Sequence, residues 1–436
     1  MFQTKLVIAT LLLCVASLQL VFVRPVVAQS ATPHRAPILG ADLTYADYPH
    51  PLIAAWEESA RSDDMAGAWT DTGLRTLRFC FGGIYSPRGS EATARLKQEN
   101  RTTNEFPWFP FSRYVEFIAA NKFTTVVAIN VEEGPEVAAE VVQSFVDRGA
   151  RDKLVAIELS NEPHLNHRPW LPEEYAARAA DVIERLTRSG VRFGLPLTVG
   201  KDRNTPTKLS DDEWNSRMMR ALASRIDLKT RTDIYGVLHL YSGGVRAKSI
   251  EFFNKAVRQF APKMRYLVTE FNIRLGLEGN PHLTNSYAME FARKLAELMA
   301  EPDIEAMYVH SVPYHSIVYW SNGRRIATVV GQKDSRLSGT ELSRGWHQTP
   351  AGKVYRLYST LSWNGRVLAF GGSDRQRYWA VQGEGGRTVV TLLNDDGKSA
   401  KKKIKLQGQE LVLSAPRRSI VCFTGDGKEI ERLSLE

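Results

Sequence analysis

The strongest constraint on the fold is a repeated alternation, beginning at Ile38, of short apolar runs with longer segments of helical spacing. The apolar runs are nearly continuous, as expected of parallel strands buried on both faces. They are ILGADL (38–43), RTLRFCFG (75–82), TTVVAIN (124–130), LVAIELS (154–160), LPLTVG (195–200), IYGVLHLY (234–241), RYLVTEF (265–271) and AMYVHSV (306–312). Eight such runs, each followed by a helix, predict an α/β fold, a closed (β/α)₈ barrel of TIM type.

The segments between these runs begin and end as helices do. PEVAAEVVQSFVDRG starts at Pro135 and stops at Gly149, with proline and glycine in the expected order. An open doubly wound sheet is the alternative topology. It would usually carry a glycine-rich phosphate loop after its first strand, and GADLTYADYPHP (40–51) supplies none.

The C-terminal segment has a different texture. Short runs such as RTVVTLLN and SIVCFTG, separated by turns that contain glycine, predict an antiparallel β-sandwich. The lysine-rich run KSAKKKIK (398–405) could bind a polyanion, but we favour a solvent-facing strand protected by its lysines. We therefore expect the barrel over residues 29–362 and the sandwich over residues 363–436.

The N-terminal segment is typical of a targeting signal. Lys5 precedes an apolar run from residue 6 to 23, and Val26 and Ala28 offer small residues before a cleavage site at Gln29. We expect residues 1–28 to be a signal peptide and the mature protein to be secreted or periplasmic. The run is also long enough for an uncleaved anchor, the one case in which membrane contact is expected.

The charge balance permits an acidic partner. The chain has 57 basic and 48 acidic residues, and losing Lys5 and Arg24 with the signal leaves 55 against 48, a net charge of +7. Such a surface suits an anionic polysaccharide, a cell surface or nucleic acid. The charges are scattered and no nucleic-acid motif is present, so nucleic acid is not expected.

Carboxylates stand at the ends of the fourth and seventh apolar runs. Asn161 and Glu162 stand where the fourth run stops, and Glu270 lies near the end of the seventh. Catalytic residues of such barrels lie at the carboxyl ends of strands, so both glutamates should face one another across the mouth. Hydrolysis of a glycosidic bond requires such a pair, one protonated and one ionised. A structural ion pair is the alternative, but the placement on strands four and seven favours catalysis.

This pattern resembles clan A of the retaining glycoside hydrolases, which share a (β/α)₈ barrel with paired glutamates on strands four and seven. A barrel followed by a C-terminal sandwich is most similar to glycoside hydrolase family 39, with families 79, 5 and 30 as alternatives. The resemblance implies that Glu162 is the general acid/base and Glu270 the nucleophile.

The resemblance also implies roles for four neighbours. Arg78 and Tyr241 should contact the nucleophile, Asn161 should hold the sugar 2-hydroxyl, and His239 belongs to the His-x-Tyr pattern of the sixth strand. A guanidinium and a hydroxyl beside a carboxylate would keep it ionised. The alternatives are an interior salt bridge for Arg78 and a buried structural histidine for His239.

The chain departs from the clan at two points. After the third strand, where many members carry a histidine, it has Asn130. At the end of the eighth strand, where many carry a tryptophan as a sugar platform, it reads VHSVPYHSIVYW. The candidates to replace that platform are Tyr314, Tyr319 and Trp320. Trp108 and Trp170, in the segments after strands two and four, are further candidates to stack on sugar rings.

The sequence therefore predicts a retaining glycoside hydrolase that degrades a polysaccharide. Basic residues after strands four, five and seven suit an anionic or bacterial exopolysaccharide, since guanidinium groups pair with carboxylates. These are Arg168, Lys201, Arg203 and Arg274. Two alternatives stay open: an exo-acting β-glucuronidase or arabinofuranosidase, and a non-catalytic carbohydrate-binding barrel. We expect a monomer without metal or cofactor, because no cluster has metal-ligand spacing and no nucleotide loop is present.

Overall fold

The computed structural model describes residues 33–43, 64–79, 111–164, 170–198, 207–241, 250–273, 284–310, 317–321 and 345–436. The predicted signal peptide, residues 1–28, lies outside these ranges. In the helices that the structure describes, no stretch has both the length and the apolarity needed to cross a bilayer.

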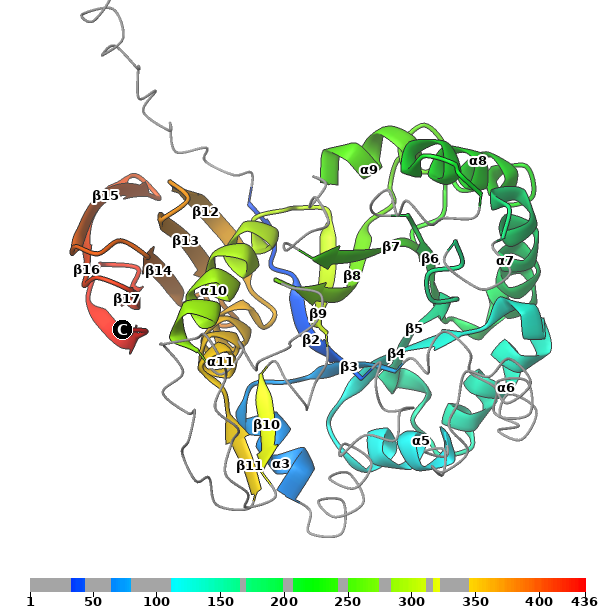
Figure 1. Ribbon diagram of the computed structural model, residues 1–436. Helices are drawn as coiled ribbons and strands as arrows, with labels where there is room; N and C mark the ends of the chain where they lie inside the picture. The colour runs from blue at the N-terminus through cyan, green and yellow to red at the C-terminus, as the bar shows by residue number, and fades with distance from the viewer. Residues whose placement is uncertain are drawn as a thin grey trace, which may run out of the picture.

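The described strands include eight that close into a parallel barrel (Figure 1). They are β2 (Ile38–Asp42), β3 (Thr76–Phe79), β4 (Thr124–Ile129), β5 (Leu154–Leu159), β6 (Arg192–Pro196), β7 (Ile234–Tyr241), β8 (Tyr266–Asn272) and β9 (Ile304–Val309). The first and last of them pair in parallel, Ile38 opposite Ala306, and this pairing closes the ring. The predicted (β/α)₈ barrel is therefore confirmed.

Helices cover the outside of the barrel (Figure 1). They are α3 (Asp64–Asp71), α5 (Phe111–Ala120), α6 (Pro135–Val146), α7 (Pro172–Leu186), α8 (Asp211–Ala223), α9 (Ile250–Val257), α10 (Asn285–Met299) and α11 (Pro350–Ser362), with short 3-10 turns η2 (Val131–Glu133), η3 (Arg151–Lys153) and η4 (Thr187–Ser189). Side chains cap several of them: Ser210 accepts a hydrogen bond from the Glu213 amide and Thr284 from the Tyr287 amide. Such caps fix where a helix starts.

The fifth barrel strand lies earlier than the sequence predicted. The apolar run suggested residues 195–200, but β6 spans Arg192–Pro196. The strand needs Gly194, where an added Cβ would lie only 2.6 Å from Val237 Cγ2. The apolar pattern hid its start because Arg192 is exposed. Past the strand, the Thr198 amide donates instead to Asn215 Oδ1 of α8, at 2.8 Å.

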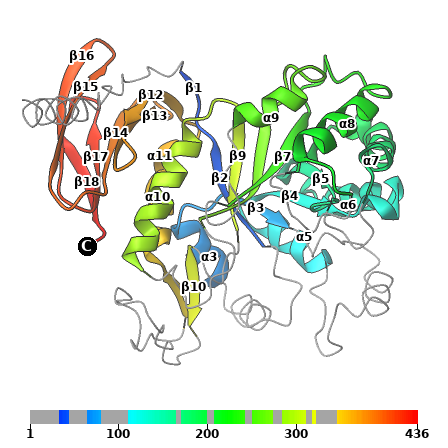
Figure 2. The same ribbon diagram turned by 45° about the horizontal axis from the view of Figure 1, so that its top comes forward.

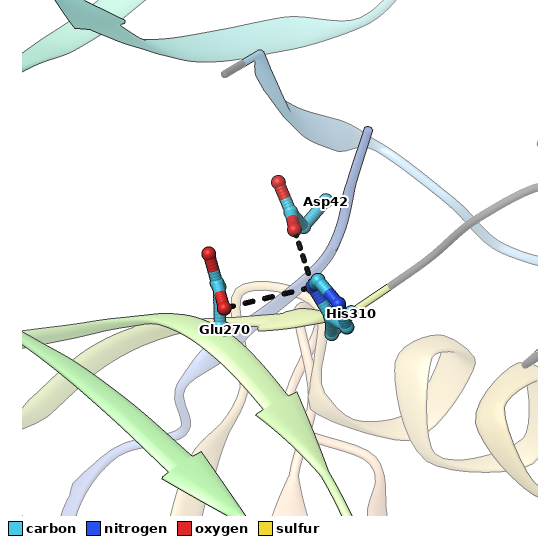
Figure 3. A group of neighbouring side chains, drawn as sticks. All are labelled: Asp42, Glu270 and His310. Carbon is cyan, nitrogen blue, oxygen red and sulfur yellow. Dashed lines mark hydrogen bonds and ion pairs between the residues drawn. The ribbon is translucent and has the colours of Figure 1, made fainter. Parts of the chain in front are cut away.

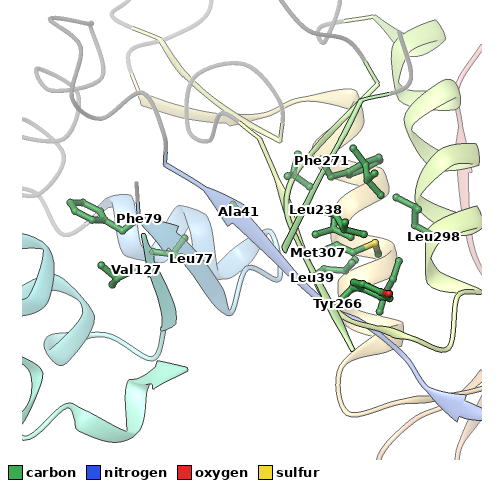
Figure 4. Packing of buried hydrophobic residues seen from close by; sticks show 14 of the residues in the cluster. Leu39, Ala41, Leu77, Phe79, Val127, Leu238, Tyr266, Phe271, Leu298 and Met307 are labelled. Carbon is green, nitrogen blue, oxygen red and sulfur yellow. The ribbon is translucent and has the colours of Figure 1, made fainter. Parts of the chain in front are cut away.

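Side chains of the barrel strands alternate between two environments. One set packs under the helices, among them Leu39, Val127 and Met307 (Figure 4). The other set points into the barrel, because neighbouring residues of a strand face opposite sides. There a small apolar cluster that includes Val237 and Tyr308 fills one layer, and charged side chains fill another.

The C-terminal residues, together with one short strand from near the N-terminus, form two antiparallel sheets. One has the order β1-β12-β13-β14-β17-β18, and the other is the hairpin β15-β16. Their strands are β1 (His34–Arg35), β12 (Arg366–Gly372), β13 (Gln376–Gln382), β14 (Thr388–Asn394), β15 (Ala400–Leu406), β16 (Gln409–Ala415), β17 (Ser419–Thr424) and β18 (Glu429–Ser434). Along the lysine-rich strand β15, Lys403 and Lys405 are exposed, whereas Ile404 is buried. The predicted sandwich is confirmed, and the lysines face solvent.

Two strands of the sandwich were not foreseen. The sequence assigned residues 29–362 to the barrel, but His34 of β1 pairs with Val367 of β12. This pairing covers the backbone of a strand that would otherwise be the sheet edge, and exposed edges are usually protected. The other strand, β18, carries mostly exposed residues and therefore lacked an apolar signal.

The barrel and the sandwich share one apolar core. Helices α10 and α11 lie between them (Figure 2), and a single cluster of buried residues runs through both. The rings of Tyr358 on α11 and Trp379 on β13 meet edge to face, with centroids 4.7 Å apart. Burying each such aromatic stabilises the fold by about 1.5–3 kcal/mol. A last hairpin, β10 (Val318–Ser321) with β11 (Gly345–Gln348), precedes α11.

Candidate active site

The chain turns sharply where β5 ends. Ser160 and Glu162 both have left-handed backbone conformations, with φ of 77° and 43°. Such conformations are strained for residues other than glycine and persist where neighbouring contacts enforce them. Here the Ser160 amide donates to Ile129 O at 2.9 Å, and Ser160 Oγ accepts from the Val131 amide at 3.2 Å. The turn brings Asn161 and Glu162 to the carboxyl-end mouth of the barrel.

Arg78 of β3 lies at the centre of the charged layer and is fully buried. Its Nε and Nη2 donate to the two carboxylate oxygens of Glu158, at 2.8 and 2.6 Å. Nη1 donates to Asp42 Oδ1 at 3.1 Å and to Glu270 Oε1 at 2.8 Å. Nη2 also donates to Asn161 Oδ1 at 2.6 Å. The Arg78 guanidinium thus connects the carboxylates of strands β2, β5 and β8 and fixes their positions relative to one another.

Glu270 of β8 is buried and is held at both oxygens. Besides the Arg78 bond, its Oε2 accepts a hydrogen bond from the Tyr241 hydroxyl at 2.5 Å. Burial alone would raise the pKa of Glu270, but nearby positive charge and this hydrogen bond hold it well below the usual range. The charges are those of His239, His310 and Arg78. Glu270 is therefore an ionised carboxylate at neutral pH.

His239 of β7 lies between the two glutamates. Its Nδ1 is 3.0 Å from Glu162 Oε1 and 3.4 Å from Glu270 Oε2. A register shift in the β7–β8 ladder places His239 directly opposite Glu270. Burial would lower the pKa of His239, but the charge of Glu270, the hydrogen bond to Glu162 and the nearby carboxylate of Glu158 raise it to about 10. The imidazole is therefore a cation that links both carboxylates.

The two glutamates are close but unequally exposed. One oxygen of each lies within 4.8 Å of the other, and of the imidazole of His239. The Glu162 side chain is 35% exposed, whereas that of Glu270 is 7% exposed. Solvent therefore reaches Glu162 far more readily than Glu270.

The structure brings together six of the residues predicted from the sequence: Arg78, Asn161, Glu162, His239, Tyr241 and Glu270. Asn130 directly follows β4 and makes a local contact, in which its Oδ1 accepts from the Glu132 amide at 3.0 Å. Trp170 is 4% exposed and belongs to the core cluster, so it offers little face for a sugar.

Three predicted aromatic contacts stay predictions. Trp108 and Tyr314 lie outside the described residues. Trp320 lies in β10, where its backbone pairs with Trp346 of β11.

Three charged residues of the site were missed. Asp42 ends β2, Glu158 lies within β5, and His310 directly follows β9. Each was visible as a polar residue in or beside an apolar run. The rule that singled out Glu162 and Glu270, applied to every strand end, would also have found Asp42 and His310.

Two groups of site residues have the donor types of a metal site: Asp42, Glu270 and His310, and Glu162, His239 and Glu270. In the first, Arg78 Nη1 already lies 3.1 Å from Asp42 and 2.8 Å from Glu270. In the second, the pKa of His239 is raised to about 10, which favours the protonated form that cannot ligate a metal. Arg78 and the protonated His239 therefore already balance the carboxylate charges that a metal ion would otherwise balance.

No protein-family model and no curated protein matched the sequence. Solved structures do match the fold. An endo-β1,6-glucanase aligns with a TM-score of 0.60 and 13% identity, over 91% of this chain and 93% of that chain. A family 30 endoxylanase from Clostridium papyrosolvens aligns at 0.52 and 11%, over 93% of both chains.

A family 39 β-xylosidase from Caulobacter crescentus aligns with a TM-score of 0.50 and 13% identity, over 86% of this chain and 84% of that chain. At such identities the likeness concerns the fold alone. The chain therefore has the barrel-and-sandwich fold seen in clan A glycoside hydrolases, as the resemblance implied.

Proposed function

We propose that this protein is a retaining glycoside hydrolase that cleaves O-glycosidic bonds of a polysaccharide. The proximity of Glu162 and Glu270, with oxygens within 4.8 Å, carries the proposal. Retaining enzymes place their carboxyl groups about 5–5.5 Å apart, and inverting enzymes about 6.5–9.5 Å apart to admit a water molecule. An oxygen pair this close is expected of the shorter, retaining separation, and this favours direct attack by one carboxylate.

In the first step, Glu270 attacks the anomeric carbon while Glu162 protonates the departing oxygen. The environment of Glu270 suits a nucleophile, because Arg78 and Tyr241 keep it ionised and oriented. Glu162 is exposed enough to meet a leaving group at the mouth. Asn161, held by Arg78, is placed beside it and suits the sugar 2-hydroxyl.

In the second step, Glu162 accepts a proton from water, and the water attacks the glycosyl ester on Glu270. The carboxylate of Glu270 is released back toward Arg78 and the imidazolium of His239. The same cations that keep Glu270 ionised therefore favour its departure from the sugar.

The finer assignments are part of the same proposal. The apolar leader at residues 1–28 supports secretion or export to the periplasm. The positive net charge and the basic residues Arg168, Lys201, Arg203 and Arg274 support an anionic polysaccharide, although these four lie outside the described residues. We propose a monomer. Exo action on a glucuronide or arabinofuranoside remains the alternative within the same chemistry.

Trapping the covalent intermediate tests the proposal. The protein is incubated with dinitrophenyl 2-deoxy-2-fluoro glycosides of glucose, xylose and glucuronic acid, then digested and analysed by mass spectrometry. One sugar should be attached to the peptide that contains Glu270, and Glu270→Gln should remain unlabelled. A label on Glu162 would reverse the roles. A barrel that only binds carbohydrate would bind the parent sugars yet acquire no label.

A further inference from the structure

Asp42 and His310 lie beside Glu270 and form a second group of neighbouring charged side chains with it (Figure 3). Asp42 is fully buried and His310 is 8% exposed. His310 Nδ1 lies 2.8 Å from Asp42 Oδ2 and 3.7 Å from Glu270 Oε2. His310 directly follows β9, the eighth barrel strand, where many members of the resembled clan carry a tryptophan and this chain departs from them.

Together with Arg78, these residues form a closed ring of alternating charge. Arg78 Nη1 bridges Asp42 Oδ1 and Glu270 Oε1. His310 Nδ1 bridges the other oxygen of each carboxylate. Each of these two cations thus contacts both carboxylates. When His239 and His310 are both protonated, the site contains three cations, with Arg78 the third. They balance three buried carboxylates, which are Asp42, Glu158 and Glu270. We name this four-residue arrangement the charge ring.

We propose that Asp42 and His310 are positioning residues, which act through the charge ring to hold Glu270 ionised and aimed at the anomeric carbon. This inference rests on the proposed function of Glu270. Asp42 keeps the imidazole of His310 turned toward Glu270. His310 in turn supplies a second fixed positive charge, opposite the one from Arg78.

The charge ring also changes state during the reaction. It is neutral while Glu270 is a carboxylate and gains one net positive charge when Glu270 forms an ester with the sugar. No proton or electron leaves Asp42 or His310 in this step. The excess positive charge favours return of the carboxylate, so the pair should assist the second step as well as the first.

Other groups also act on Glu270, and the test must separate them. His239 and Tyr241 approach it from β7, Arg78 from β3, and Glu162 lies across from it. The pKa of His310 is raised: burial would lower it, but the charge of Glu270 and the bond to Asp42 outweigh burial. Removing Asp42 should therefore let His310 lose its proton at a lower pH.

The first experiment measures kcat/KM against pH for wild type and His310→Gln, with the dinitrophenyl glycoside that wild type turns over best among glucoside, xyloside and glucuronide. Dinitrophenolate departs with little protonation, so the acidic limb reports Glu270. His310→Gln should move that limb upward by about 1 pH unit or more, because one of the cations is lost. At neutral pH, kcat/KM should fall about tenfold.

The control is Tyr287→Phe, whose hydroxyl donates to Asn272 Oδ1 at the end of β8, where the Asn272 amide in turn donates to the His310 carbonyl at 3.4 Å. It removes a buried hydrogen bond without changing charge, so its acidic limb should coincide with that of wild type. If His310→Gln also leaves the limb in place, or moves it downward, the positioning role is overturned and His310 only supports the fold.

The second experiment needs no turnover. In NMR spectra of histidine-labelled protein, the His310 signal is assigned as the one that is lost in His310→Gln. This imidazole should be protonated at pH 7 in wild type. In Asp42→Asn it should lose its proton at a lower pH than in wild type. A neutral imidazole in wild type overturns the charge ring. If Asp42→Asn does not fold, wild type and His310→Gln still decide. If wild type cleaves none of the glycosides, the proposed function is overturned. The NMR titration tests the charge ring separately.

Discussion

The two glutamates at the mouth of the barrel are built in opposite ways. Glu270 lies inside the regular strand β8, is buried, and is bonded at both oxygens. Glu162 follows the end of β5 on a strained left-handed backbone, and its side chain is 35% exposed. His239 lies within ion-pair distance of both.

The difference matches two chemical tasks. A nucleophile must stay ionised and still, which rigid strands and fixed cations provide. A general acid/base must exchange protons with the leaving group and with water, which requires access to solvent. Under the proposed roles, the fold would meet both needs by placing Glu270 in a strand and Glu162 just after one.

The largest expected contrast is in turnover. Glu270→Ala should reduce hydrolysis of a dinitrophenyl glycoside to background, a loss on the order of 10⁶-fold, because no covalent intermediate can form. Glu162→Ala should lose about 10²–10⁴-fold, mainly in the second step. Azide, which needs no base, should restore Glu162→Ala with retention of configuration. Restoration of Glu270→Ala with retention would show that the roles are exchanged.

The next largest contrast should be in the free energy of unfolding of variants at Glu270 and Glu162. The pKa of Glu270 is lowered by folding, so its carboxylate contributes stability that is present above the unfolded value of about 4.3 and is lost as pH falls toward the folded value. Urea unfolding should show Glu270→Gln less stable than wild type by roughly 3 kcal/mol at pH 7, with the gap closing below about pH 4. Glu162→Gln should stay within about 0.5 kcal/mol of wild type at pH 7. Equal losses for both variants would contradict the contrast.

Tyr241→Phe probes the hydrogen bond that only Glu270 receives. Removing a bond of 2.5 Å to a charged group should cost about 1.5–3 kcal/mol, a fall of roughly 10–100-fold in kcat/KM. Combined with Glu162→Ala, the losses should add nearly as free energies, since the hydrogen bond of the Tyr241 hydroxyl goes to Glu270. His239→Gln is the matched comparison, because it contacts both glutamates and should show strong non-additivity with Glu162→Ala. Strong coupling of Tyr241→Phe to Glu162→Ala would argue against two separately built groups.

The smallest contrast concerns the backbone. Glu162 has φ of 43°, which glycine adopts without strain, so Glu162→Gly should be more stable than Glu162→Ala by about 0.5–1 kcal/mol. Glu270 lies in a strand, so Glu270→Ala should there be more stable than Glu270→Gly by a similar amount. Denaturation midpoints of the four variants test both signs, and the same order at the two positions would refute the backbone difference.

The barrel was predictable because its strands are buried on both faces and therefore read as apolar runs. The same reasoning placed Glu162 and Glu270, since carboxyl ends of parallel strands meet at one mouth. It did not reveal the pairing of Asp42 with His310, which are separated by 268 positions in the sequence. That contact exists only because β2 and β9 close the ring, and no local pattern encodes closure.

Burial of individual aromatics was harder still to foresee. Trp170 follows a strand end, as a sugar platform would, yet it packs into the core. The exposed fraction of a side chain depends on which distant parts of the chain pack against it. A two-residue strand such as β1 likewise has no periodicity to detect, because its pairing depends on an edge formed by β12.

That pairing has a kinetic consequence. During synthesis, residues 34–35 are made first among the described elements, but their partner strand follows nearly the whole barrel. Bringing such distant segments together is slow, because chain entropy must be lost before any contact repays it. The seam between β1 and β12 should therefore form only when the chain is almost complete, and a nascent barrel must persist with that seam open. β1, the shortest of the described strands, should thus pair only after both the barrel and β12 have been made.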